Sequence, residues 1–348
     1  MHMADALLAP AVAGVMYAAS GVAAGHSVIK LKKDEDDKKL PVMAVTAALV
    51  FAGQMINFTI PGTGSSGHIC GGMMLSALLG PQAGFLSMIV ILLIQCLFFA
   101  DGGLLALGAN IWNMAFYGCF VGYYLIWRPI MRSKLFGEGA KGQRGRIILA
   151  SILGCIITLQ LGAFSVVLET TLSGITELPF GAFAALMLPI HLAIGLVEGI
   201  VTAVVLCFIY NARPDLIMDV DKSLIGSGKK SLKSVIAIVA VVALVIGGGL
   251  SLLASSNPDG LEWALFGNAE EGYAENMGLD EDDFGIASDA ADKAESIQES
   301  TSFLPDYAFP DSDSPLGTTV SGIVGSAIVA GLAAVICLAG GFFRKKKA

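Results

Sequence analysis

Long apolar blocks alternate with short polar connections along most of this chain. Nine blocks have the length and composition expected of helices: residues 8–29, 40–57, 69–80, 82–100, 109–131, 147–173, 181–211, 233–254 and 318–343. A helix needs about 20 apolar residues to cross a bilayer. Block 69–80 is too short to span alone, which indicates a broken or re-entrant element. The pattern therefore predicts an all-α polytopic membrane protein.

The basic residues follow the same map. Twenty of the 21 Lys and Arg lie in segments 30–39, 128–146 and 213–233 and in the C-terminal tail. Connections 58–68, 101–108 and 174–180 contain no Lys or Arg. If the N-terminus lies outside and the chain crosses the membrane nine times, every basic segment lies on the cytoplasmic side, as the positive-inside rule requires. We therefore expect an outside N-terminus and a cytoplasmic C-terminus.

A polar segment at 212–232 divides the chain into two predicted modules. Residues 1–211 form a seven-helix module, and 212–232 is a cytoplasmic linker. Residues 233–348 form a two-helix module with transmembrane helices 233–254 and 318–343 around a large external loop, 255–317. That loop carries sixteen Asp and Glu against a single Lys. Its polar composition between about 268 and 300 predicts flexibility.

Composition excludes several functional classes. With 55% hydrophobic and 14% charged residues, the chain is too apolar for an ordinary soluble domain. No basic patch with interleaved aromatic residues indicates a nucleic-acid partner, so the lipid bilayer is the expected environment. The six scattered cysteines form no CxxC pair. The sequence has no Ser-His-Asp set and no phosphate-binding loop, so the chain is predicted to be neither an enzyme nor an ATPase.

Ionisable residues inside apolar blocks are functional candidates because charges are costly at membrane depth. They include Glu169, His191 and Glu198. His191 and Glu198 stand two helical turns apart on one face, as a hydrogen-bonded pair or as a second metal site. An alternative function for the chain is therefore that of an ion-coupled secondary metal carrier that uses these three residues. Cys70 is either a packing residue or an additional thiolate ligand.

The start Met1-His2 offers a chelate. The α-amine of Met1 and the amide nitrogen of His2 close a five-membered ring on a metal ion. The same amide and the Nδ1 atom of His2 close a six-membered ring. Three nitrogens then lie in one plane, and His68, in a glycine-rich loop on the same outer side, is the expected fourth ligand. Square-planar nitrogen coordination favours Ni(II) or Cu(II), although such a start and a lone loop histidine also occur without any ligand role.

At these residues the chain resembles the CbiM/NikM family, the substrate-capture subunits of energy-coupling-factor (ECF) transporters for cobalt and nickel. The resemblance lies in the Met1-His2 start, GSSGHICGG (64–72), ADGGLLALGANIWNMAF (100–116) and HLAIGLVEGIVTA (191–203). The second module resembles the NikN-type PDGLE domain through SSNPDGLEW (255–263) and LPDYAFP (304–310). The start departs from the family's Met-His-Ile-Pro-Asp-Gly at Ala4 and Ala6, which changes the expected path of the N-terminal turn.

The resemblance implies a metal site made of the Met1 amine, the His2 amide and imidazole, and His68. It implies Ni(II) or Co(II) as transported substrate, with no permanently bound cofactor. The implied partners are a pair of ATPase subunits and a transmembrane coupling (T) subunit in a prokaryotic cytoplasmic membrane. The NikN-like module and the planar nitrogen set favour nickel. A metal sensor without transport activity is the other alternative.

Four polar residues near the expected site are candidates for orienting the imidazoles, because ligating histidines usually donate their second N–H to an oxygen. Loop or helix capping is the competing role for each of them. They are Ser65, Ser66, Asp101 and Asn110. We also expect the PDGLE motif to lie near the mouth of the site.

Overall fold

The computed structural model describes the chain outside residues 32–38, 222–229, 269–271, 273–275, 278, 280–283, 311, 313 and 346–348. Most of the basic connection 30–39, much of the linker and much of the acidic run therefore lie outside the described residues. The elements are η1 (Asp5–Leu7), α1 (Pro10–Leu31), α2 (Lys39–Gln54), β1 (Phe58–Ile60), β2 (Ser65–Gly67), α3 (Gly72–Leu79), α4 (Pro81–Phe99), α5 (Leu107–Asn110), η2 (Ile111–Trp127), α6 (Arg128–Met131), α7 (Gly139–Ser173), α8 (Phe180–Ala212), η3 (Pro214–Leu216), α9 (Leu232–Gly248), η5 (Leu250–Leu253), α10 (Gly260–Phe266), α11 (Asp289–Thr301), η6 (Pro305–Tyr307) and α12 (Leu316–Lys345).

The chain is an all-α polytopic membrane protein, as the sequence predicts. Five helices of the described part, α1, α4, α7, α8 and α12, are long and apolar enough to cross a bilayer, and α2 and α9 are shorter apolar helices. The outer faces of α7 and α8 expose large apolar side chains, such as Leu172 at 73% and Val204 at 64%. Surfaces of this kind suit contact with lipid, which is as apolar as the side chains themselves.

Glycines bring the central helices close together. A Cβ atom added at Gly199 of α8 would lie 2.7 Å from the Cα atom of Ile152 in α7, and one at Gly195 would lie 2.9 Å from that of Ile156. The same close approach brings Gly72 of α3 against η2. Small residues allow backbones to approach in this way.

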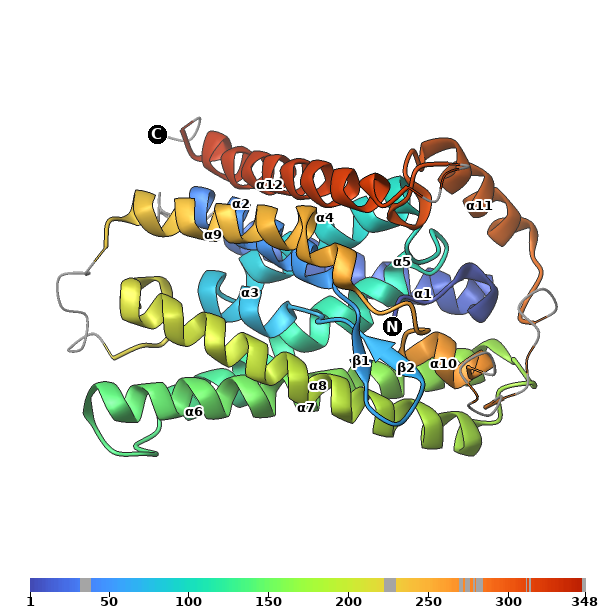
Figure 1. Ribbon diagram of the computed structural model, residues 1–348, viewed down its shortest axis with the longest axis horizontal. Helices are drawn as coiled ribbons and strands as arrows, with labels where there is room; N and C mark the ends of the chain where they lie inside the picture. The colour runs from blue at the N-terminus through green and yellow to red at the C-terminus, as the bar shows by residue number, and fades with distance from the viewer. Residues whose placement is uncertain are drawn as a thin grey trace.

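The two predicted modules pack against one another. Helices α9 and α12 contact each other and both contact α2, and Figure 1 shows them lying along α2 at one side of the bundle. Their mutual contact is tight, because a Cβ atom on Gly247 would lie 3.0 Å from the carbonyl oxygen of Gly322. The second module is therefore a part of the helix bundle and not an appendage to it.

The segments between the helices differ from the sequence-based expectation in two places. Residues 58–67, expected as a plain loop, form an antiparallel hairpin in which Thr59 pairs with Ser66. The expectation of a flexible loop across 268–300 was wrong for its last part, where α11 is a helix capped by Ser288. Gln298 of α11 donates hydrogen bonds to the carbonyl oxygens of Cys96 and Gly102, at 2.9 and 2.7 Å. These bonds tie the helix to the membrane module.

In Figure 1 the polar elements lie towards the two opposite ends of the helix bundle. The α6–α7 connection and the C-terminal ends of α8 and α12 lie at one end. The hairpin, α10 and α11 lie towards the other, together with the start of α1. The candidate ligands and the PDGLE motif therefore gather at the end away from the basic α6–α7 connection.

Candidate metal centre

The first residues of the chain enter the protein and do not extend into solvent. Met1 is 6% exposed and Met3 is fully buried. Asn110 clamps this segment, since its Oδ1 accepts from the Met3 amide at 2.8 Å and its Nδ2 donates to the Met3 carbonyl at 3.1 Å. Asp5 accepts a hydrogen bond from the Ala106 amide at 3.0 Å. The α-amine is thus held inside the protein by hydrogen bonds between the N-terminal residues and segment 101–110.

The structure brings together His2 and His68, which are 66 positions apart. Their rings stack with centroids 5.3 Å apart and planes 19° from parallel. The Nδ1 atom of His68 lies 3.0 Å from the carbonyl oxygen of Ile69, which can only accept, so Nε2 carries the lone pair. Burial, then the neighbouring Met1 amine and His2, lowers the pKa of His68 to about 4. His68 is therefore neutral at pH 7, as a metal ligand must be.

His2 pairs with Asp101. Its Nδ1 atom lies 3.0 Å from Oδ1 of Asp101, while its Nε2 atom is buried without a hydrogen-bond partner among the described residues. Tyr307 donates to the other carboxylate oxygen of Asp101 at 2.5 Å. Burial raises the pKa of Asp101, but the His2 charge and the hydrogen bonds from His2 and Tyr307 outweigh it and hold the pKa well below its ordinary value. Asp101 therefore remains a carboxylate at neutral pH.

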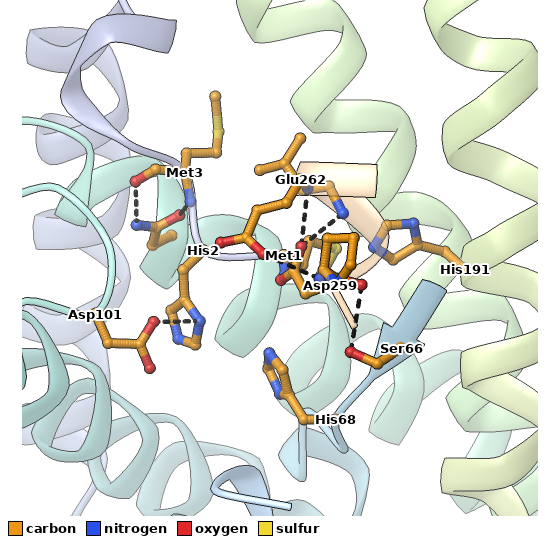
Figure 2. A network of polar contacts seen from close by, with 12 residues as sticks. Met1, His2, Met3, Ser66, His68, Asp101, His191, Asp259 and Glu262 are labelled. Carbon is orange, nitrogen blue, oxygen red and sulfur yellow. Dashed lines mark hydrogen bonds and ion pairs between the residues drawn. The ribbon is translucent and has the colours of Figure 1, made fainter. Parts of the chain in front are cut away.

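The Met1 amine pairs with Asp259, a residue of the PDGLE segment. The side chain of Met1 is 5% exposed and that of Asp259 is 16% exposed, so this is a largely buried ion pair. Asp259 also caps α10, where Oδ1 accepts from the amides of Leu261 and Glu262 at 2.7 and 3.0 Å. Burial raises its pKa, but the Met1 amine and His68 lower it well below its ordinary range. Figure 2 shows Met1, His2, His68 and Asp259 around one centre.

The remaining sequence candidates have other contacts. Of the four residues predicted to orient an imidazole, only Asp101 bonds to a histidine ring in the described part of the structure. Asn110 bonds to the backbone of Met3 instead. Ser66 donates from its amide to the Pro258 carbonyl at 2.8 Å and from its hydroxyl to that of Asn257 at 2.7 Å. Ser65 bonds to the carbonyls of Ser66 and Pro258. The two serines therefore dock the PDGLE turn on the hairpin and do not orient an imidazole.

His191 and Glu198 do not form the hydrogen-bonded pair that their spacing allows. His191 donates to the Met187 carbonyl at 2.8 Å. Glu198 accepts from the amides of Cys70 and Gly71 at 2.8 and 2.9 Å. Glu198 therefore anchors the loop that follows His68, and Cys70 presents its thiol to the Met114 carbonyl at 3.1 Å.

Glu169 lies away from this loop. It accepts from the side-chain amide of Asn113 at 2.8 Å. Within the described residues no group of three or more His, Cys, Asp or Glu side chains is arranged to hold a metal ion.

Replacing Glu198 by Ala is expected to destabilise the His68 loop. The change leaves two buried amides without an acceptor, at about 1–3 kcal/mol each. Thermal unfolding in detergent measures the effect, with Glu169→Ala as a matched control that removes one side-chain contact. A Glu198→Ala protein no less stable than the Glu169→Ala protein would contradict the anchoring role.

Sequence reasoning missed Asp259. The available signal was the PDGLE motif, but nothing in its sequence says that the aspartate reaches an amine 258 positions away. Glu262 of the same motif accepts a hydrogen bond from the Asp259 amide at 3.0 Å and completes the α10 cap. Asp259 is therefore the point at which the second module enters the candidate site.

A bundle of apolar helices with a buried amine, two stacked histidines and flanking carboxylates defines a metal-handling membrane protein. The chain belongs to the CbiM family, described as the cobalt uptake substrate-specific transmembrane region, whose model matches residues 2–216. The PDGLE domain model matches residues 233–340.

Relatives and solved structures agree with this assignment. The fused nickel transport protein NikMN of Rhodobacter capsulatus is 30% identical over 95% of this chain and 96% of its own length. A NikMN protein assigned to nickel transport in Archaeoglobus fulgidus is 36% identical over 95% and 96%. The crystal structure of a truncated transition metal transporter is 33% identical, with a TM-score of 0.52, and the match covers 60% of this chain and 98% of that one. The chain is thus a membrane protein of a nickel and cobalt transport family.

Proposed function

We propose that this chain is the substrate-capture subunit of an ATP-driven ECF importer for Ni(II) or Co(II). It binds the ion at the outer face of a prokaryotic cytoplasmic membrane through the Met1 amine, the His2 amide and imidazole, and His68. The observation that carries the proposal is the burial of the Met1 amine beside two stacked imidazoles, His2 and His68. Burying a charged amine is costly unless it is paired. The pairing with Asp259 therefore allows the amine to lie inside the protein beside the two imidazoles.

Metal binding replaces two interactions of the metal-free site. The amine leaves Asp259 and loses its proton, and the His2 ring leaves Asp101 and turns its Nδ1 atom towards its own amide. The amide also loses its proton. The affinity should therefore rise with pH, since protons compete with the ion for both nitrogens. The carboxylates of Asp101 and Asp259 remain nearby to balance the charge of the ion.

Once Nδ1 of His2 has turned to the ion, the N–H at Nε2 can donate to the Asp101 carboxylate. Replacing Asp101 by Asn is therefore expected to reduce nickel affinity by about 10–100-fold, the usual effect of removing such a partner of a metal-binding histidine. Calorimetric titration of the purified protein measures it. Asp5→Asn is the matched control, because Asp5 bonds to the Ala106 amide and not to a histidine. Equal affinities of the Asp101→Asn and parent proteins would remove Asp101 from the site.

Transport requires partners in this proposal. A pair of ATPase subunits and a T subunit would drive inward release, since the sequence contains no phosphate-binding loop of its own. The site then faces outwards, with the N-terminus outside and the basic connections in the cytoplasm. We assign residues 1–211 to capture and residues 233–348 to a module that closes over the captured ion, joined by the linker 212–232.

Nickel is the favoured ion. A planar set of four nitrogens is the geometry that Ni(II) accepts readily. The full-length relatives named above carry nickel transport names, whereas the CbiM protein of Sorangium cellulosum, 31% identical over 56% of this chain, is named for cobalt. Cobalt is therefore the second candidate.

Radioactive nickel uptake into proteoliposomes tests the transport function. We expect ATP-dependent accumulation when this chain is reconstituted with the ATPase pair and the T subunit, and none with this chain alone. An ATPase variant without its phosphate-binding lysine serves as the control. Uptake by this chain alone that follows the membrane potential would instead support a secondary carrier built on Glu169, His191 and Glu198. Tight binding without uptake in the complete assembly would support a metal sensor.

A further inference from the structure

His191 of α8 has a nitrogen that no other group in the described structure uses. The ring is 1% exposed. Its Nδ1 atom lies 2.8 Å from the carbonyl oxygen of Met187, which can only accept, so Nδ1 carries the hydrogen. Its Nε2 atom therefore has a lone pair, and it is buried without a hydrogen-bond partner among the described residues. Such atoms are rare in folded proteins and call for an explanation.

The His191 ring borders the candidate metal centre. It lines a cavity of about 10 Å³ together with Met1, His68, Cys70 and Asp259, which is space for about one water molecule or one ion. Figure 2 shows the ring reaching from its helix towards Met1 and Asp259. Gly260 lies against the ring, since a Cβ atom there would be 3.1 Å from the Cε1 atom of His191. The ring is thus fixed in place by α10 on one edge and by the Met187 carbonyl on another.

This arrangement has the form of a metal-binding histidine. Ligating imidazoles usually donate one ring N–H to a carbonyl or carboxylate and bind the metal through the other nitrogen. His68 shows the same pattern, with Nδ1 at the Ile69 carbonyl. Unlike His68, which lies in a loop, His191 lies in the transmembrane helix α8. It borders the cavity on the side of α10 and therefore approaches the Met1–His68 site from a different element.

We propose that His191 is an axial nitrogen ligand for the transported ion and determines how well the site accepts Co(II). The proposal rests on the planar site of the proposed function. Four nitrogens in a plane satisfy Ni(II) and leave the axial positions open. Co(II) gains more than Ni(II) from a fifth ligand, because it is less stabilised by a planar field. His191 therefore broadens the site from nickel to cobalt.

Separate titrations of Ni(II) and Co(II) into the purified full-length chain test this inference. In His191→Gln the side-chain amide can still donate to the Met187 carbonyl. We expect Co(II) affinity to fall about tenfold or more and Ni(II) affinity to change less than about threefold, since the planar set is intact. Gln160→Leu is the matched control, because Gln160 donates to the Leu188 carbonyl on the same turn of α8 and does not line the cavity.

X-ray absorption of the Co(II) complex of the parent protein gives an answer that needs no variant. We expect five nearest ligands including three imidazoles. Four ligands with two imidazoles would overturn the inference, as would an equal loss of both metals in His191→Gln or no loss of Co(II). The proposed function fails in a different way, through absent metal binding by the parent or binding that survives His2→Ala.

Discussion

Three glycines added before Met1 should abolish high-affinity nickel binding. The extension turns the Met1 nitrogen into an amide and moves the primary amine away from the His2 amide, so the five-membered ring can no longer close. Loss of one ligand should exceed the 10–100-fold effect of losing an orienting group, so we expect the affinity to fall by at least about 100-fold, as measured by calorimetry. His2→Ala and His68→Ala should cause losses of similar size.

Two comparisons sharpen this result. His26→Ala changes an exposed histidine of α1 and should leave the affinity unchanged. A single added glycine is a different case, because His2 becomes the third residue and the amine, two amides and imidazole then form their own four-nitrogen plane. That protein should bind nickel without needing His68. Parent-like affinity in the three-glycine protein, with intact mass confirming the extension, would exclude the amine as a ligand.

Replacing Asp259 by Lys should expel the N-terminus from its position in the protein. The change puts a cation against the buried Met1 amine and removes the N-cap of α10. Breaking a buried ion pair costs about 3–5 kcal/mol, and loss of the cap adds about 1 kcal/mol. We expect a lower unfolding temperature and a nickel affinity lower by at least about 100-fold, because the amine is no longer held beside His68.

Asp259→Asn is the matched variant. Asn caps helices as well as Asp does, so the change removes the charge and keeps the cap. The N-terminus should stay in position, and nickel affinity should fall less than in the Lys variant, because no cation is placed against the amine. Equal losses of nickel affinity in the Lys and Asn variants would mean that the carboxylate charge, which both changes remove, and not the cap, which Asn keeps, connects the PDGLE segment to the site.

The sequence was sufficient to predict the helices and their environment. Apolar blocks of about 20 residues have few alternatives to membrane helices, because lipid leaves backbone groups no other partners. The ends were less certain. Helix α7 begins at Gly139, eight residues before the apolar block at 147, because polar residues continue a helix once it has left the membrane core. The hairpin at 58–67 and helix α11 had no clear pattern, since both are held by contacts with distant segments.

The candidate site was predictable only where bonding is local. The chelate proposed for Met1 and His2 depends on ring sizes that two adjacent residues fix by themselves. The choice of His68 needed the resemblance to a family and the assumption of a shared side. The contact of Asp101 with His2 was open between two roles, and the pairing of Asp259 with Met1 was not foreseen at all. The spacing of His191 and Glu198 suggested one joint role, whereas each residue bonds to a different partner.

The sequence by itself therefore determined that this chain is a helical membrane protein, and it was enough to propose a chelating N-terminus, because hydrophobic length and local bond geometry act within short stretches. The tertiary structure alone decided which distant groups meet that N-terminus. Glycine contacts between helices set the distances, and the hairpin and α10 carry Asp259 to the amine. Burial then matters more than spacing, because a charge or lone pair removed from water must find a partner wherever the fold supplies one.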